Sequence, residues 1–521
     1  MEQKRSVLWA DDEIDLFRPH ILYLEERGFT VTPVRSGDEA LEKIGAGRFD
    51  AVLLDEMMPG RDGLSTLEEI KDRYPTVPVV MITKSEEEDL IASAIRKQIT
   101  DYLVKPVNPI QVLSALRKIL DREKIREGGI AQEYLEEFTR IRATIGGRPT
   151  WEDWVDITLR FARWDIEFEK HRDVGLLQTH EDMRREANAE FAKFIETNYE
   201  GWVNGGEGPV LSPDLFSAHV LPHLKEGKKV YVVVVDCMRL DQWLAIESLL
   251  LPFYNVETNY YCSILPTATP YSRNALFAGL YPADIAKHHP DYWGENSTDE
   301  RSKNRYERQL LDEYLARKKL ELYPAPRYVK IYNTEEAGNL KRQLASFYSV
   351  PLVSLVFNFV DILAHGRSDS EILRELAPDE SAFRSLMRSW FQHSALFDIL
   401  RAIAQLDAVV VITTDHGAVV AKKATIVYGN RETSTNLRYK HGDNLGCDPK
   451  HALHLKDPKR FRLPADSLTK HYIFAKENYY FVYPTKFHDY ERQYKGTFQH
   501  GGISLEEMVL PCVTLRPKRV R

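Results

Sequence analysis

Residues 230–236 read VYVVVVD and residues 408–417 read AVVVITTDHG, and these two stretches decide the fold of the larger part of the chain. Each contains a continuous apolar run rich in valine, and each run is followed by a carboxylate, Asp236 or Asp415. Such runs are typical of strands that are buried on both faces of a parallel sheet. The carboxyl ends of parallel strands share one edge of the sheet, so we expect a site at that edge.

A third apolar run, residues 352–360, is predicted to be a further strand that ends at Asp361. The strand ends and the motifs DILAH and FQHGG supply six potential metal ligands: Asp236, Asp361, His365, Asp415, His416 and His500. Aspartate and histidine suit zinc, and six ligands are enough for two ions. Thr269, in PTATPYSRNALFAG, has a hydroxyl that such ions could activate as a nucleophile, and Thr267 is the alternative. This set is sufficient for metal-assisted hydrolysis of a phosphate ester.

In the first 122 residues, short apolar runs alternate with segments of helical period. The expected strands are residues 7–10, 31–34, 51–54, 79–82 and 102–104. The expected helices lie near residues 13–27, 36–45, 63–73, 86–97 and 109–121. This alternation predicts a second parallel sheet, with helices on both of its faces.

Acidic residues again stand at strand ends in this first segment, because Asp11 and Asp12 follow the first strand and Asp55 ends the third. Three carboxylates that meet at one edge repel each other unless a cation neutralises them, and an all-oxygen set suits magnesium. Thr83 ends the fourth strand. Lys105, after the fifth strand, adds a positive charge that suits a phosphoryl group.

These motifs, with LLDEMMPG around Asp55 and Pro106 after Lys105, resemble those of a response-regulator receiver domain over about residues 1–122. The resemblance implies a flavodoxin-like fold and a set of roles: Asp55 accepts a phosphoryl group, Asp11, Asp12 and Asp55 hold Mg²⁺, Thr83 and Tyr102 form the switch pair, and Lys105 contacts the phosphate. It also implies a cognate sensor histidine kinase as a partner, and a homodimer that forms on phosphorylation.

Between residues 123 and 205 the strand signals vanish, and we expect a helical-bundle linker of about three helices. The segment from Trp151 to Phe168 has an unusually wide apolar face, so this helix is expected to contact more than one neighbour. The linker is either a rigid spacer or a relay of the receiver's state. An output domain that reads DNA would need a basic recognition helix, whereas acidic and basic residues are interspersed here.

The ordered motifs of residues 206–521 resemble the alkaline phosphatase superfamily, particularly its nucleotide phosphodiesterase branch. The resemblance implies two zinc sites, one formed by Asp361, His365 and His500 and the other by Asp236, Asp415 and His416. It also implies that Thr269 is the nucleophile and that Asn274 binds a phosphate oxygen.

The whole chain, including RETSTNLRYKHGDNL at residues 431–445, resembles the PorX-type response regulators, which are associated with type IX secretion and have a PglZ output domain of the same superfamily. The resemblance implies a cytoplasmic regulator that acts on a membrane-associated secretion apparatus. We therefore expect an α/β multidomain two-component response regulator whose output domain is a zinc-dependent phosphodiesterase acting on nucleotides or short oligonucleotides. The alternative is a phosphorylation-dependent signalling adaptor whose phosphatase-like domain mainly binds a partner.

The composition and net charge argue against some classes of function. A formal net charge of -8 over 521 residues disfavours specific binding of duplex DNA, and no apolar run is long and clean enough for membrane insertion. The four scattered cysteines suit a reducing cytoplasm. The basic residues between Arg431 and Arg462 could steer an oligonucleotide or form a solvated insertion. Tyr292, Trp293 and Tyr306, within an insertion near 286–330, could stack bases or form the core of a cap.

Overall fold

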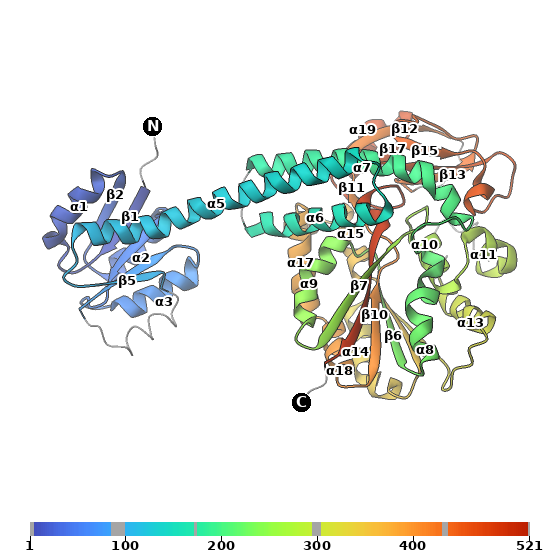
Figure 1. Ribbon diagram of the computed structural model, residues 1–521, viewed down its shortest axis with the longest axis horizontal. Coiled ribbons are helices and arrows are strands. Elements are labelled where there is room, and N and C mark those ends of the chain that lie inside the picture. Colours follow the sequence, from blue (N-terminus) through green and yellow to red (C-terminus); the bar gives the residue numbers. More distant parts are fainter. Residues whose placement is uncertain (1–4, 85–98, 171–173, 294–303, 430–435, 519–521) are drawn as a thin grey trace. The chain divides into compact units, whose positions relative to one another are not determined.

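The computed structural model describes residues 5–84, 99–170, 174–293, 304–429 and 436–518. They form two compact units, one ending at Glu137 and the other beginning at Phe138 (Figure 1). The boundary lies within helix α5 (Pro109–Gly146), which begins in the first unit and ends in the second.

The first unit contains a five-stranded parallel sheet with the order β2-β1-β3-β4-β5, as expected for a flavodoxin-like receiver. Its strands are β1 (Arg5–Ala10), β2 (Phe29–Val34), β3 (Ala51–Asp55), β4 (Val79–Thr83) and β5 (Asp101–Val104). Val7 and Trp9 of β1 belong to one hydrophobic cluster, and Leu8 and Ala10 belong to another. The central strands β1, β3 and β4 are therefore buried, and β1 contributes to clusters on both faces of the sheet, which explains why these strands are continuous apolar runs.

The described helices of this unit are α1 (Arg18–Glu25), α2 (Gly37–Ala46), α3 (Gly63–Arg73) and the start of α5. The expected helix at 13–27 is divided, because a 3₁₀ turn at Ile14–Phe17 precedes α1. Helices α2 and α3 begin after Ser36 and Asp62, whose side chains accept hydrogen bonds from backbone N–H groups of the first turn. The expected helix at 86–97 lies outside the described residues.

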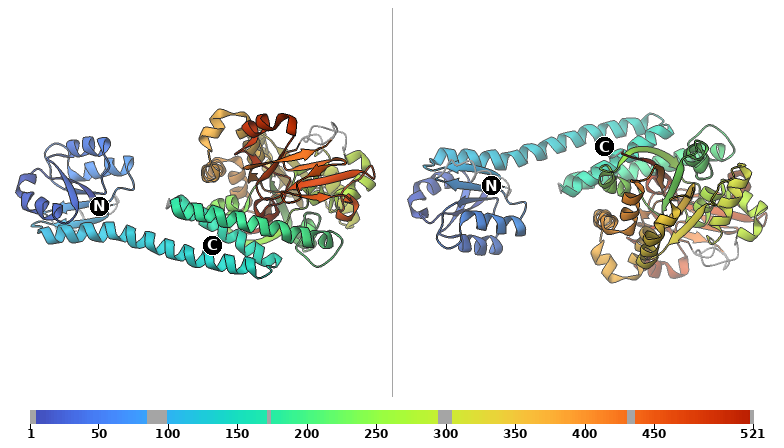
Figure 2. Two further views of the ribbon diagram at one scale, coloured as in Figure 1. Left: turned by 90° about the horizontal axis from the view of Figure 1, so that it is seen from above. Right: turned by 90° about the horizontal axis from the view of Figure 1, so that it is seen from below.

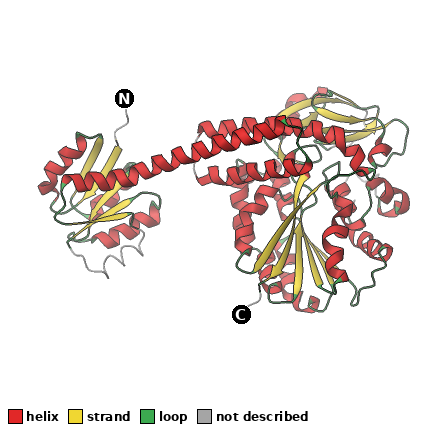
Figure 3. Ribbon diagram, viewed as in Figure 1, coloured by secondary structure: helices red, strands yellow, loops and turns green. Residues whose placement is uncertain are grey.

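The second unit contains a six-stranded sheet with the order β7-β19-β10-β6-β9-β8 (Figure 3). Its strands are β6 (Lys229–Val235), β7 (Tyr254–Cys262), β8 (Arg327–Ile331), β9 (Leu352–Phe357), β10 (Ala408–Thr413) and β19 (Val509–Pro517). Strand β6 pairs in parallel with β9 and β10, whereas β19 runs antiparallel to both of its neighbours. Val232 and Val234 pack in one hydrophobic cluster and Val233 and Val235 in another, so β6 is buried on both faces.

The predicted strand at 352–360 is too long by three residues, because β9 ends at Phe357 and helix α15 (Phe359–Asp369) begins two residues later. Asp361 therefore lies in the first turn of a helix rather than at the end of a strand. The run stays apolar because Val360 and Leu363 form the buried face of α15. A short apolar run does not by itself distinguish a buried strand from the start of a buried helix.

The rest of the second unit surrounds this sheet. Its minor strands are β11 (Val419–Val420), β12 (Lys423–Tyr428), β13 (Tyr439–Asp443), β14 (Gly446–Cys447), β15 (Ala452–Leu455), β16 (Lys470–Ala475), β17 (Tyr479–Val482) and β18 (Phe498–Gln499). Its other helices are α6 (Trp151–Lys170), α7 (Val174–Val203), α8 (Leu221–Lys225), α9 (Leu240–Leu250), α10 (Thr269–Ala278), α11 (Pro282–His288), α13 (Glu307–Arg317), α14 (Thr334–Gln343), α16 (Glu371–Leu376), α17 (Glu380–His393), α18 (Ala395–Ile403), α19 (Phe487–Tyr494) and α20 (Leu505–Met508). Among the described helices, none combines the length and apolar character needed to cross a bilayer.

Helices α6 and α7 lie side by side (Figure 2), and α6 also packs on α9 and on β19 of the six-stranded sheet. Trp154 of α6 is fully buried, and its ring meets that of Phe191 of α7 edge to face at 5.3 Å. The same hydrophobic cluster includes Leu505 and Met508 of α20. The wide apolar face of α6 is thus explained, because this helix contacts both α7 and the sheet domain.

Replacing Trp154 with alanine should lower the free energy of unfolding of the second unit by about 3–5 kcal/mol, because it leaves a large cavity between α6 and α7. Trp164→Ala is the matched control, since Trp164 is on the same helix but only partly buried. Guanidinium unfolding followed by circular dichroism measures both losses. Equal losses for the two variants would contradict the packing described for α6.

Candidate functional site

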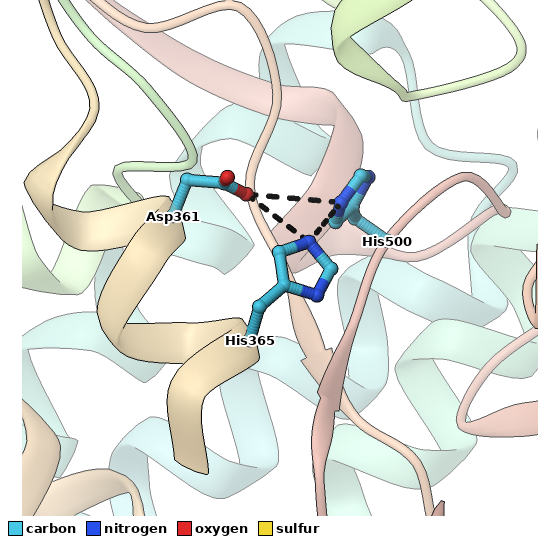
Figure 4. Close-up of side chains that lie close together, drawn as sticks. All are labelled: Asp361, His365 and His500. Atoms are coloured by element: carbon cyan, nitrogen blue, oxygen red, sulfur yellow. Dashed lines mark hydrogen bonds and ion pairs between the residues drawn. The ribbon is translucent and has the colours of Figure 1, made fainter. Parts of the chain in front are cut away.

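The first cluster of predicted ligands consists of Asp361, His365 and His500 (Figure 4). Asp361 and His365 are one turn apart on α15, and His500 directly follows β18. The Nε2 atom of His365 lies 3.1 Å from Nε2 of His500 and 3.3 Å from Oδ1 of Asp361. Oδ1 of Asp361 lies 3.8 Å from Nε2 of His500. Three donor atoms therefore converge on one point.

The second cluster consists of Asp236, Asp415 and His416, which follow the adjacent strands β6 and β10. The Nε2 atom of His416 lies 3.7 Å from Oδ1 of Asp236 and 3.7 Å from Oδ2 of Asp415. The hydroxyl of Thr269, at the start of α10, lies 3.0 Å from Nε2 of His416 and 3.5 Å from Oδ1 of Asp236. The structure thus brings the predicted nucleophile against this cluster.

The two clusters are neighbours. The imidazole rings of His416 and His500 stack with their centroids 4.1 Å apart. Strands β11 and β18 pair antiparallel, with Val419 opposite Gln499, and this pairing holds the two histidine-bearing loops together. All six predicted ligands therefore lie in one site, although they come from three strand ends or loops and one helix.

Backbone carbonyls orient both stacked histidines. The Nδ1 atom of His416 lies 3.0 Å from the carbonyl oxygen of Gly417, and Nδ1 of His500 lies 3.2 Å from that of Thr267. A carbonyl can only accept, so each Nδ1 carries the proton and each Nε2 keeps a lone pair for a metal. Burial also lowers the pKa of His416, which keeps its imidazole neutral.

Thr267 and Thr269 have different surroundings. The Thr267 hydroxyl is fully buried, donates to the carbonyl of Gly502 at 2.9 Å and accepts from the N–H of Gly501 at 3.0 Å. It therefore fastens the loop after His500. The Thr269 hydroxyl instead contacts two predicted metal ligands.

Arg273 belongs to the site but was not among the residues predicted from the sequence. Its buried guanidinium lies 2.5 Å from Oδ2 of Asp236, 3.8 Å from Oδ2 of Asp415 and 2.7 Å from Oε1 of Glu307. Arg273 stands one helical turn after Thr269 on α10, and this i,i+4 spacing is the signal that could have identified it.

Two of the three carboxylates of the site are costly to ionise. Burial, with repulsion from Asp415 and Asp361, raises the pKa of Asp236, although Arg273 opposes the rise. Burial also raises the pKa of Asp415. Burial alone would raise the pKa of Asp361 too, but His365 and His500 hold it below its ordinary value. A divalent cation would relieve this repulsion.

Other predicted residues have different surroundings. The Asn274 amide donates to the carbonyl of Pro270 within α10 at 2.9 Å, so its role at a phosphate oxygen stays a prediction.

In the basic stretch 431–462, whose first five residues lie outside the described part, Arg438 and Lys440 are buried and cannot be a solvated steering surface. Arg438 pairs instead with buried Glu507. The aromatic rings of the 286–330 insertion contact one another or the core: Tyr292 stacks on Tyr306, and Trp293 meets Tyr271 edge to face.

In the first unit, Asp11, Asp12 and Asp55 have carboxylate oxygens close together at the carboxyl ends of β1 and β3. The Nζ atom of Lys105 lies 2.9 Å from Oδ2 of Asp11 and 2.9 Å from Oδ1 of Asp55. Burial, with repulsion from Asp11, raises the pKa of Asp55 to about 6, although Lys105 opposes it.

Thr83 and Tyr102, the residues predicted as the receiver's switch pair, differ in how exposed their side chains are. The buried Thr83 hydroxyl donates a hydrogen bond to the carboxylate of Glu56. Tyr102 is 42% exposed. Thr83 therefore has a partner other than Asp55 in this structure.

Three models of known families match successive parts of the chain. "Response regulator receiver domain" matches residues 7–117, "PorX response regulator linker domain" matches residues 124–203, and "BREX system PglZ alkaline phosphatase-like domain" matches residues 215–515. The last of these covers more than half of the chain.

Similar individual proteins match the receiver part. Transcriptional regulatory protein ResD of Bacillus subtilis is 34% identical over 117 residues, which are 22% of this chain and 48% of that protein. Regulatory protein VanR of Enterococcus faecium is 31% identical over 119 residues, 23% of this chain and 51% of that protein. The chain thus spans about half the length of these relatives.

Among solved structures, chemotaxis protein CheY4 of Vibrio cholerae is 28% identical with a TM-score of 0.22, and the match covers 22% of this chain and 99% of that one. A CheY-like receiver of Methanospirillum hungatei JF-1 is 24% identical with a TM-score of 0.23, over 24% of this chain and 98% of that one. By its three successive domains, the chain belongs to the PglZ alkaline phosphatase-like family and is a response regulator of the PorX type, with a receiver, a PorX linker and a PglZ output domain.

Proposed function

We propose that the output domain is a zinc-dependent phosphodiesterase that acts on nucleotides or short oligonucleotides under control of the receiver. The observation that carries this proposal is the position of the Thr269 hydroxyl, 3.0 Å from Nε2 of His416 and 3.5 Å from Oδ1 of Asp236. A threonine hydroxyl held against a buried cluster of metal-binding side chains is the arrangement needed for nucleophilic attack on a phosphate ester.

The donor atoms fit two zinc ions. Ligands about 2.1 Å from a tetrahedral zinc ion lie about 3.4 Å from one another. The distances within Asp361, His365 and His500 are 3.1, 3.3 and 3.8 Å. Those from His416 to Asp236 and Asp415 are both 3.7 Å. Mixed imidazole and carboxylate sets of this kind favour zinc over magnesium or calcium.

When bound, zinc supplies Lewis-acid stabilisation of negative charge on the phosphate ester and lowers the pKa of a nearby hydroxyl. The chain's own residues orient the attack. Pro270 follows Thr269 directly at the start of α10, and the side chain of Asn304 donates to the Thr269 carbonyl at 2.9 Å. These contacts fix the backbone on which the nucleophilic oxygen is held.

A diester is a better substrate than a monoester for this arrangement. A monoesterase needs extra positive groups for the additional charge on its substrate. The guanidinium of Arg273 is already paired with Asp236 and with Glu307, so it adds little net positive charge to the site. This supports a phosphate that carries a second substituent, as in nucleotides or oligonucleotides.

The receiver part of the proposal concerns Asp55. We expect it to accept a phosphoryl group from a sensor histidine kinase in the cytoplasm, with Mg²⁺ held by Asp11, Asp12 and Asp55 and with Lys105 contacting the phosphate. The contacts of Lys105 with both Asp11 and Asp55 support this. By likeness to PorX-type regulators, the process controlled is type IX secretion.

The output domain should bind two zinc equivalents. His500→Ala should remove one site and His416→Ala the other, because each deletes an imidazole that points Nε2 into its cluster. His288→Ala, which changes an exposed histidine of α11, is the control and should retain both. Competition titration with a chelator measures the affinities. Two full-affinity sites in either of the first two variants would contradict the ligand assignment.

Thr269→Val should reduce hydrolysis of a generic phosphodiester by at least about a thousandfold, because it deletes the attacking oxygen and retains the shape of the side chain. Thr267→Val should instead lower stability by about 1–3 kcal/mol, because it leaves loop hydrogen bonds unmade, and its folded fraction should stay active. Steady-state rates with zinc-loaded protein test both. An unchanged rate for Thr269→Val would eliminate it as the nucleophile, and no turnover by the wild type would favour the adaptor function.

Beryllofluoride with Mg²⁺ should convert the full chain from monomer to dimer, because a phosphoryl mimic on Asp55 draws the Thr83 hydroxyl away from Glu56 and favours the state that pairs. Asp55→Ala should abolish the shift. Asp38→Ala, which changes an exposed aspartate paired with Arg61, should retain it. Light scattering at micromolar protein gives the mass. An unchanged mass with Asp55 occupied would rule out the dimer switch.

A further inference from the structure

A chain of buried ion pairs connects the linker helices α6 and α7 to the metal-site loops of the output domain. Its four members come from different elements: Asp165 from α6, Arg184 from α7, Glu380 from the start of α17, and Arg239 from the residue that precedes α9. Arg184 pairs with Asp165, Glu380 lies 3.3 Å from Arg184, and Glu380 also pairs with Arg239. The side chains of Arg239, Arg184 and Asp165 are 4%, 14% and 13% exposed.

Arg239 contacts both loops that carry the ligands of the second cluster. It follows Asp236 by three residues, and its Nη1 atom lies 3.5 Å from the carbonyl oxygen of Ala418, two residues after His416. Its Cγ atom lies directly over Gly417, where an added Cβ would come within 3.3 Å of it. The same Cβ would come within 1.9 Å of the Glu506 carbonyl, so Gly417 is held between Arg239 and α20. Arg239 therefore links the two loops.

A buried guanidinium is stable only where carboxylates compensate it. Two carboxylates, those of Asp241 and Glu380, compensate Arg239. Asp241 accepts from Nε at 2.9 Å and from Nη2 at 2.6 Å, and Glu380 accepts from Nη1. Glu380 is shared, because Arg184 of the linker also binds it. Loss of Arg184 from this position would leave Glu380 bound to Arg239 alone. The electrostatic attraction between Glu380 and Arg239 would then be stronger.

Asp165 keeps Arg184 in place. Burial alone would raise the pKa of Asp165, but Arg184 and His180 outweigh burial and hold it below its ordinary value, so Asp165 is ionised. A parallel path runs through Arg384, which lies 2.7 Å from Glu169 of α6 and 2.7 Å from Asp241. Both carboxylates that compensate Arg239 are thus tied to linker helices.

We propose that Arg239 is a positioning residue for the metal cluster of Asp236, Asp415 and His416, and that α6 and α7 set its position through Asp165, Arg184 and Glu380. The inference rests on the proposed metal site. Metal affinity then depends on how the linker helices are arranged. If α7 is displaced, the charge around Arg239 is redistributed and the loops of this cluster move. The cluster of Asp361, His365 and His500 should respond less, because Arg239 reaches it only through neighbours: the guanidinium lies 5.9 Å from the centre of the Phe498 ring, and His416 stacks on His500.

The test is zinc affinity in the full chain. Asp165→Asn keeps the shape of the side chain but releases Arg184, and Glu380→Gln removes the charge that Arg239 shares with Arg184. Each should weaken zinc binding at one of two sites about tenfold or more, the range found for partners outside the ligand shell, with the other site less affected. Asp156→Asn is the matched control, because Asp156 is an exposed aspartate of α6 that pairs with Arg160, and both affinities should stay as in the wild type.

A spectroscopic readout separates positioning from mere structural support. With Co²⁺ in place of zinc, Asp165→Asn should change the visible absorption of one of the two bound ions, which reports ligand geometry. If the network only holds the fold together, thermal stability falls while both zinc affinities and the cobalt spectrum match the wild type, and the inference is overturned. If Asp165→Asn does not fold, Glu380→Gln decides, since its side chain is 26% exposed. A wild-type protein that binds fewer than two zinc ions would instead contradict the proposed function itself.

Discussion

Electrostatic repulsion among buried carboxylates at the carboxyl edge of the six-stranded sheet is the constraint on which the output domain depends. Asp361 and Asp415 lie close enough to Asp236 to raise its cost of ionisation, and the main protein cation beside them, Arg273, is shared with Glu307. Such a cluster is stable only if further positive charge is supplied or if protons are retained. The two metal ions proposed for this site would supply that positive charge.

The surrounding sequence serves largely to hold the ligand loops against that repulsion. Glu507, fully buried, accepts hydrogen bonds from Arg438, from the Ser504 hydroxyl and from the N–H of Gly502. Thr267 binds the same loop from the other side. These contacts leave His500 little freedom to rotate, which keeps its Nε2 directed at the first cluster. Preorganisation of this kind is what a metal site needs from residues that do not touch the metal.

In the receiver unit, too, clustered carboxylates are compensated by a protein cation, but this cation is a lysine. There Lys105 lies between Asp11 and Asp55, as Arg273 lies between Asp236 and Asp415. A lysine ammonium is a compact point charge on a flexible stem, which suits the phosphoryl acceptor proposed for Asp55. The guanidinium of Arg273 is instead held by two carboxylates, those of Asp236 and Glu307.

Both sheets could be predicted from the sequence, because continuous valine-rich runs leave few alternatives to doubly buried strands. The six candidate ligands could also be predicted, but only Asp236, Asp415 and His416 follow strands of the six-stranded sheet, whereas Asp361 and His365 lie on α15 and His500 follows β18. The sequence did not determine where β9 ends, since apolar character alone does not separate strand from helix across Phe357 and Phe359. Tertiary structure alone decided that Arg438 and Lys440 are buried, and that Thr267 fastens a loop whereas Thr269 faces the ligands. It also decided that Arg184 of the linker helix α7 and Arg239, which contacts the ligand loops, bind the same carboxylate, that of Glu380. Such pairings join residues more than a hundred positions apart, and no local pattern of residues records them.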